Sequence, residues 1–189
     1  CWLLFNASYA FADVETKQTG GTGKKGACFS RQNDQWSYKI SQLKANWYYS
    51  WGRELREERP KNVEFVPMFW GKWFKDDDIE YLLNLKNQNQ IKFVLGFNEP
   101  DSPNQSNMSV DEAIALWPKL EAIGLPLGSP ATVNPENKWM IDFMQKADDL
   151  ELRVDFICVH HYGGKNVQGL LHKLHQVHQR YNRPIWITE

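Results

Sequence analysis

The sequence predicts an α/β protein of the (β/α)₈ class, a TIM barrel that is truncated after its seventh strand. Short apolar segments alternate with longer amphipathic ones, and such repeated strand–helix units favour a parallel sheet. The apolar segments are hydrophobic almost throughout, as is typical of strands buried on both faces. A closed barrel needs eight strands and usually about 250 residues. The strand segments visible in this chain are Gly26–Phe29, Ala45–Tyr49, Val63–Phe69, Ile91–Phe97, Leu125–Ser129, Val154–His160 and Pro184–Thr188.

Helix start signals stand between several of these strands. Three consecutive aspartates, Asp76–Asp78, place negative charge where it complements a helix dipole. Ser109 and Glu112 have the spacing of a capping box, and Asn137 can cap a third helix. An open doubly wound sheet is the alternative architecture, but it would usually carry a ligand-binding turn after its first strand. The glycines of Gly20–Gly23 precede that strand instead of following it.

The N-terminus predicts secretion. Residues 1–12 are interpreted as the tail of a signal peptide, because an apolar run ends in Ala10-Phe11-Ala12. A buried N-terminal strand is the alternative. Residues 13–24 are expected to form a flexible lead-in, and residues 25–189 a barrel domain that is incomplete at its C-terminal end. We therefore expect the mature protein outside the cell or in the cell wall.

The net charge and the apolar runs limit the expected partners, and the cysteine positions bear on disulfide formation. The net charge of −1 gives no electrostatic reason to expect nucleic acid or an anionic membrane as partner. Beyond the leader, no apolar run approaches the length of a membrane span, so the mature protein is not expected in a membrane. Cys28 and Cys158 lie in strands that are not neighbours, which favours two buried free thiols over the disulfide that a secreted protein could form.

Two glutamates follow buried strands, and both are candidate catalytic residues. Glu99, in Asn98-Glu99-Pro100, ends the fourth strand, and Glu189 ends the seventh. The carboxyl ends of barrel strands form the active-site face, where a carboxyl group can act as general acid. Strands four and seven face each other across the mouth, so the pair could stand about 5–5.5 Å apart, as glycoside hydrolysis with retention requires. The alternatives are a helix-capping Glu99 and a Glu189 that only ends the chain.

Aromatic residues at strand ends suggest a sugar-binding cleft, with packing of loops over the barrel rim as the alternative. Indole and phenol rings can stack on sugar rings. Alternation from Glu189 predicts that Trp186 points away from it and packs against helices. Trp117 and Trp139 lie in predicted helices and are expected in the core. The aromatic residues predicted at or just past strand carboxyl ends are Trp47, Trp51, Trp70, Trp73 and Tyr162.

Histidines and two sequons complete the set of candidate residues. His160 and His161, at the end of strand six, are positioned to reach the site. Three further histidines recur every third residue on a predicted helix, where a solvated face is more plausible than a weak metal site, so no metal is expected. Asn104 and Asn107 begin two N-glycosylation sequons in the loop after Glu99. The three helical histidines are His172, His175 and His178.

Six motifs in order resemble glycoside hydrolase family 128, a fungal-type glycosyl hydrolase catalytic core, from about Lys25 to Glu189. The resemblance implies a barrel enzyme that cleaves β-1,3-glucan. We expect endo action, which the sequence does not distinguish from exo action, no metal or organic cofactor, and a monomer. The motifs are Trp47-Tyr48-Tyr49-Ser50-Trp51, Pro67-Met68-Phe69-Trp70-Gly71, Gly96-Phe97-Asn98-Glu99-Pro100-Asp101, Gly128-Ser129-Pro130-Ala131, Val154-Asp155-Phe156-Ile157 with His160-His161-Tyr162-Gly163, and Trp186-Ile187-Thr188-Glu189.

The resemblance also assigns roles. It implies that Glu99 is the acid/base and Glu189 the nucleophile, that Asn98 hydrogen-bonds the sugar 2-hydroxyl, and that Tyr162 orients the nucleophile. The chain departs from the family at two positions near the cleft, which bears on subsite preference: Ser50 replaces a usual Asn and His161 a usual Trp. The further residues expected to bind substrate are Trp47, Tyr48, Trp51, Trp70 and His160.

Two other functions remain open at this point. The first is a β-glucan-binding barrel of the cell wall with little or no turnover, for which the departures at Ser50 and His161 leave room. The second is a barrel glycosidase of another specificity, such as a β-1,4-glucanase or a mannanase.

Overall fold

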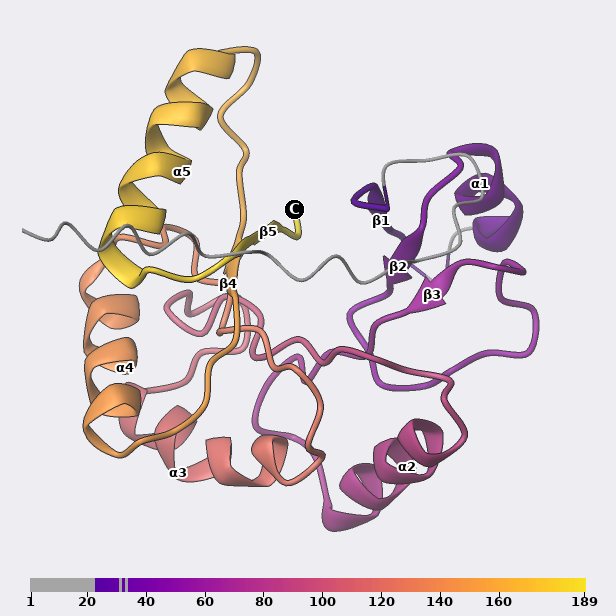
Figure 1. The fold of residues 1–189 in the computed structure, drawn as a ribbon, viewed down its shortest axis with the longest axis horizontal. Coiled ribbons are helices and arrows are strands. Elements are labelled where there is room, and N and C mark those ends of the chain that lie inside the picture. Colours follow the sequence, from indigo (N-terminus) through magenta and orange to yellow (C-terminus); the bar gives the residue numbers. More distant parts are fainter. Residues whose placement is uncertain (1–22, 31, 33) are drawn as a thin grey trace, which may run out of the picture.

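The computed structural model describes residues 23–30, 32 and 34–189. Within this part of the chain, short strands and longer helices follow one another, and the helices lie on the outside of the strands (Figure 1). The elements are β1 (Gly26–Cys28), α1 (Trp36–Gln42), β2 (Trp47–Tyr49), β3 (Glu64–Phe65), α2 (Asp76–Asn87), α3 (Val110–Glu121), α4 (Lys138–Asp149), β4 (Ile157–Val159), α5 (Val167–Tyr181) and β5 (Ile185–Ile187).

All strand pairings are parallel, and each predicted strand segment pairs with the next one in sequence. β1, β2 and β3 form one sheet, and β4 and β5 form another. The two sheets are linked by isolated parallel bridges, which are Met68 with Leu95, Val94 with Leu127, Asn98 with Ala131 and Gly128 with Phe156. The prediction of a parallel α/β fold is therefore confirmed. Among the described residues no pairing closes the series into a barrel.

Two apolar clusters lie on opposite sides of the strands. The larger cluster packs strand residues such as Tyr48 and Ile157 against the helices, with Trp117 and Phe143 at its centre. The smaller cluster, on the other side of the strands, includes Tyr49, Leu95 and Phe156. Adjacent residues such as Tyr48 and Tyr49 fall in different clusters because successive strand residues point to opposite faces.

An aromatic stack fills part of the smaller cluster, and we call it the inner stack. The ring centroid of Trp186 lies 4.7 Å from that of Phe156 and 4.9 Å from those of Phe93 and Trp47. The prediction that Trp186 packs against the helices is wrong, because β5 ends at Ile187 and the alternation does not continue to Glu189. The residues of the inner stack are Trp47, Phe93, Phe156 and Trp186.

The predicted helix starts are confirmed. Ser109 caps α3: its hydroxyl accepts from the Glu112 N–H, and the Glu112 carboxylate accepts from the Ser109 N–H. Asn137 caps α4 by accepting from the Met140 N–H at 2.9 Å. The Asp78 carboxylate accepts from the Lys75 N–H at the start of α2. α3 and α4 then pack side by side against the strands (Figure 1).

Cys28 and Cys158 are both free, as predicted. The predicted signal-peptide tail, and the lead-in up to residue 22, lie outside the described residues. Within the residues that are described, none of the helices has the length and apolar character that crossing a bilayer demands.

Candidate active site

Backbone hydrogen bonds fix Glu99 at the carboxyl end of its strand. The Glu99 N–H donates to the Ala131 carbonyl at 2.7 Å, and the Asn98 N–H donates to the Trp70 carbonyl at 2.9 Å. Glu99 has a φ of +39°, in the left-handed region that non-glycine residues seldom occupy. The neighbouring Asp101 carboxylate accepts from Asn137 Nδ2 at 2.7 Å, which ties this loop to the start of α4.

Glu189 lies directly after β5, beside the end of β4. The Thr188 N–H donates to the Val159 carbonyl at 2.9 Å, and the His161 N–H donates to the Glu189 carbonyl at 2.8 Å. The two strand ends are therefore held together by main-chain hydrogen bonds on both sides of His160. This pairing carries the Glu189 side chain to the same edge of the strands as Glu99.

Three neutral donors surround the Glu189 carboxylate. Trp51 Nε1–H donates to Oε1 at 2.7 Å, and the Tyr162 hydroxyl donates to Oε2. The Tyr49 hydroxyl shares its single hydrogen between Oε1 at 3.2 Å and the Thr188 carbonyl at 2.9 Å. Hydrogen bonds to a carboxylate favour its ionised form. The indole N–H of Trp51 can only donate a hydrogen bond and cannot accept one. The pocket therefore stabilises negative charge on Glu189.

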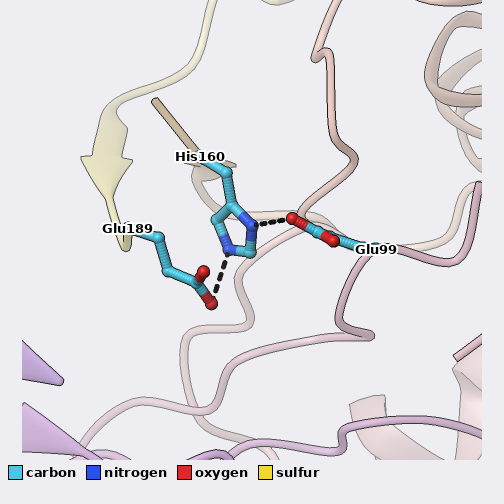
Figure 2. A group of neighbouring side chains, drawn as sticks. All are labelled: Glu99, His160 and Glu189. Carbon is cyan, nitrogen blue, oxygen red and sulfur yellow. Dashed lines mark hydrogen bonds and ion pairs between the residues drawn. The ribbon is translucent and has the colours of Figure 1, made fainter. Parts of the chain in front are cut away.

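His160 stands between the two carboxylates (Figure 2). Its Nδ1 lies 2.9 Å from Glu99 Oε1, and its Nε2 lies 3.4 Å from Glu189 Oε1. The His160 side chain is 1% exposed. One ligand atom from each of these three residues lies within 4.8 Å of the others. Two glutamates far apart in sequence thus share one small site.

The phenols and the nearest thiol remain protonated beside this charge. The hydrogen bond to Glu189, followed by burial, raises the pKa of Tyr162 to about 12. Burial first, and then the charge of Glu189, raise the pKa of Tyr49 and that of the Cys28 thiol. Tyr49 and Tyr162 consequently act as neutral hydrogen-bond donors throughout the neutral range.

Glu99 has a different environment from Glu189. Among the described residues, the hydrogen-bond partner of its side chain is His160 Nδ1. Glu189 therefore has three neutral donors, whereas Glu99 has one imidazole that can donate or accept. Two carboxyl groups in unequal environments can take different roles, one as nucleophile and one as acid.

Asn98 supplies a polar group beside the carboxylates. Its side chain is buried, at 3% exposure, and Nδ2 donates to Gln105 Oε1 at 3.3 Å. Its Oδ1 is buried without a hydrogen-bond partner among the described residues. Leaving a buried carbonyl oxygen unpaired costs free energy, so a ligand hydroxyl that donates to it would be stabilising.

The structure separates the predicted aromatic residues into two groups. Trp51 and Tyr162 contact Glu189, and Trp70 stacks on Trp73, which is 61% exposed, with 5.7 Å between ring centroids. Trp47 is at the wrong end of its strand for the predicted role, because β2 begins there. Its ring packs over Gly26, where a Cβ would lie 2.1 Å from an indole carbon.

Tyr48 also lies away from the carboxylates. It is 1% exposed and packs in the larger apolar cluster between Trp36 and Phe65. The strand motif indicated correctly that this segment reaches the site, but its contributing residue is Tyr49. Tyr49 and Gln105 were not predicted as site residues, and alternation counted within β2 could have indicated Tyr49.

The expected absence of a bound metal and the use of the two glycosylation sequons stay predictions. The ligand atoms of Glu99, His160 and Glu189 are close enough to hold a metal ion, although both ring nitrogens already face carboxylate oxygens. Asn104 and Asn107 are exposed in the loop that follows Glu99. The expectation that the reaction needs no cofactor rests on the sequence alone.

A parallel α/β fold with two glutamates and indole rings at the strand carboxyl ends is typical of glycoside hydrolases. The profile of one family, the glycosyl hydrolase catalytic core, matches residues 26–189. The chain belongs to this family.

Solved structures of glycoside hydrolase family 128 are similar to this fold. A subgroup I endo-β-1,3-glucanase from Amycolatopsis mediterranei, in complex with laminaripentaose, is 35% identical with a TM-score of 0.75, over 88% of this chain and 70% of that one. A subgroup III curdlan-specific exo-β-1,3-glucanase from Blastomyces gilchristii is 26% identical with a TM-score of 0.69, over 87% of this chain and 75% of that one.

A curated relative is much longer than this chain. Alkali-sensitive linkage protein 1 of Schizosaccharomyces pombe is 32% identical over 165 residues, which cover 76% of this chain and 26% of the relative. The chain thus spans about a quarter of the length of that protein.

Proposed function

We propose that this protein is a retaining endo-β-1,3-glucanase in which Glu189 is the nucleophile and Glu99 the acid/base. The observation that carries the proposal is the unequal hydrogen bonding of two carboxylates whose nearest oxygens lie within 4.8 Å. Retaining glycosidases keep their carboxyl groups about 5–5.5 Å apart, whereas inverting ones need about 6.5–9.5 Å for an intervening water.

The reaction proceeds in two displacements. Glu99 protonates the glycosidic oxygen while a Glu189 oxygen attacks the anomeric carbon, so the C1–O bond breaks and a glycosyl ester forms. Water then attacks the same carbon, loses its proton to Glu99 and releases Glu189. The buried and unpaired Oδ1 of Asn98, the residue before Glu99, supports the proposal that this amide hydrogen-bonds a sugar hydroxyl.

Substrate and mode of action are supported by the relatives. The similar solved enzymes act on β-1,3-glucan, and several contain laminari-oligosaccharides. A subgroup II endo-acting enzyme and the exo-acting enzyme are each 26% identical, whereas the subgroup I endo-acting enzyme is 35% identical, and the proposal of endo action rests on this likeness to subgroup I. The signal-like N-terminus supports action outside the cell.

Hydrolysis of soluble β-1,3-glucan tests the proposal, with reducing ends and product sizes as readouts. We expect short oligosaccharides, and a loss of rate of at least about 100-fold in Glu99→Gln and in Glu189→Gln, because each change removes a group that acts in the transition state. Glu80→Gln, an exposed change on α2, serves as the matched control and should keep full activity.

Other results would assign a different function. Full activity in Glu99→Gln would reject the catalytic assignment. Binding of the polymer without release of reducing ends would indicate a glucan-binding barrel. Faster hydrolysis of β-1,4- or β-1,6-linked glucans than of β-1,3-glucan would reject the proposed specificity.

A further inference from the structure

We propose that His160 is a positioning residue that holds the acid proton on Glu99 as long as Glu189 is ionised. The inference rests on the proposed function. It starts from the observation that one buried imidazole faces both carboxylates, each through a different ring nitrogen (Figure 2). A neutral imidazole carries hydrogen on one nitrogen and a lone pair on the other, so the two contacts cannot be set independently.

The charge on Glu189 determines which nitrogen carries the hydrogen. The carboxylate is stabilised as an anion by Trp51 and two tyrosines. His160 Nε2 lies 3.4 Å from its Oε1 and has no hydrogen-bond partner among the described residues. A lone pair facing an anion at this distance is repelled, whereas an N–H is attracted. An ionised Glu189 therefore favours hydrogen on Nε2.

The contact with Glu99 follows from this tautomer. With hydrogen on Nε2, Nδ1 is an acceptor, and it lies 2.9 Å from Glu99 Oε1. Two acceptors do not approach to hydrogen-bond distance unless a proton lies between them. The carboxyl group of Glu99 supplies that proton. An ionised nucleophile thus favours a protonated acid, which is the combination that the first displacement needs.

The same ring can reverse its preference after the first displacement. Glu99 has then given its proton to the departing sugar, and Glu189 is an uncharged ester. Nε2 no longer faces an anion, so the single ring hydrogen can reside on Nδ1 and donate to the Glu99 carboxylate, which accepts a proton from water in the second displacement. The imidazole carries one hydrogen in both states. Moving it from Nε2 to Nδ1 by exchange with water therefore neither adds a proton to the site nor removes one.

The remaining titratable groups around this unit do not compete for the proton. Tyr49 and Tyr162 contact Glu189 as neutral donors, and Cys28 lies beyond Tyr49. The unit therefore consists of Glu99, His160 and Glu189.

Two substrates that differ in leaving group test the proposal. Hydrolysis of β-1,3-glucan needs a proton on the leaving oxygen, whereas a 2,4-dinitrophenyl β-laminaribioside releases a stable anion without one. In His160→Asn and His160→Gln we expect kcat/KM on glucan to fall about 10- to 100-fold. The burst of dinitrophenolate should stay within about 3-fold of the wild-type burst, because nucleophilic attack is unaffected. His172→Asn, an exposed change on α5, is the matched control.

The pH profile provides a second readout. An amide has its acceptor and its donor on fixed atoms, so neither variant can couple the proton on Glu99 to the charge on Glu189, and the alkaline limb of kcat/KM on glucan should move to lower pH in both variants. Equal losses on the two substrates with an unmoved alkaline limb would overturn the role of His160. Wild-type protein that cleaves neither substrate would instead overturn the proposed function. Retained dinitrophenolate release shows that a variant is folded.

Discussion

Glu189 accepts hydrogen bonds from Trp51, Tyr49 and Tyr162, which come from two different segments of the chain. Strand-end reasoning predicted Glu99, Glu189, Trp51 and Tyr162 near this site, since the carboxyl ends of parallel strands meet at one edge. It could not predict that one imidazole lies between the two glutamates. That contact depends on how far the strands carrying residues 99, 160 and 189 are staggered, which residue types do not determine.

The donor from Trp51 should matter for rate. Trp51→Phe removes the N–H that lies 2.7 Å from Glu189 Oε1, and a hydrogen bond to a charged group contributes about 1.5–3 kcal/mol. We expect kcat/KM on β-1,3-glucan to fall about 10- to 100-fold. Trp36→Phe removes an indole N–H from α1, in the larger apolar cluster, and should leave kcat unchanged. An unaffected rate in Trp51→Phe would show that this donor does not act on the nucleophile.

Among the elements, α2, α3 and α4 were predictable from local signals because their caps use side chains within one turn of the helix. α1 was missed. Its N-cap residue Gln35 has a φ of +59° and makes no side-chain cap hydrogen bond, so no signal marks its start. The assignment of Trp186 failed because alternation was counted back from Glu189 across the end of β5.

The capping box at Ser109 gives a prediction about how much the start of α3 contributes to stability. Ser109→Ala removes the hydroxyl that accepts from the Glu112 N–H, so the free energy of unfolding should fall by about 1 kcal/mol. Ser41→Ala is the control, because that exposed hydroxyl donates to the Ser37 carbonyl within α1 and caps nothing. Urea unfolding of both variants measures the difference. Equal stability of the two would show that the box contributes little.

For the molecule as a whole, the sequence predicted a parallel α/β arrangement from the alternation of apolar and amphipathic segments. The structure has that arrangement, but two central segments pair only through isolated bridges and no closed barrel is formed among the described residues. Hydrophobic patterning reports which faces are buried. It does not report how many hydrogen bonds each strand pair makes, so the extent of the sheet could not be predicted.

Buried tyrosines predict how stability depends on pH. Burial raises the pKa of Tyr181 to about 12, and it also raises the pKa values of Tyr48 and Tyr49. The unfolded chain loses these protons near pH 10, whereas the folded chain keeps them, so unfolding releases protons and stability falls as pH rises from about 10 to 12. Denaturant unfolding across this range should show the fall, and a less steep one in Tyr181→Phe. A constant stability would contradict it.

The inner stack affects how sugars enter and leave the site. Trp47, Phe93, Phe156 and Trp186 pack against one another on the same face of the strands as Tyr49 and Trp51, but toward the strand amino ends, since β2 begins at Trp47. Close-packed interiors leave few voids larger than a water molecule, so this end has no passage for a sugar. Among the described residues, sugars are therefore expected to reach Glu99 and Glu189 from the strand carboxyl ends. Short products that leave from the same face should compete directly with the polymer for entry.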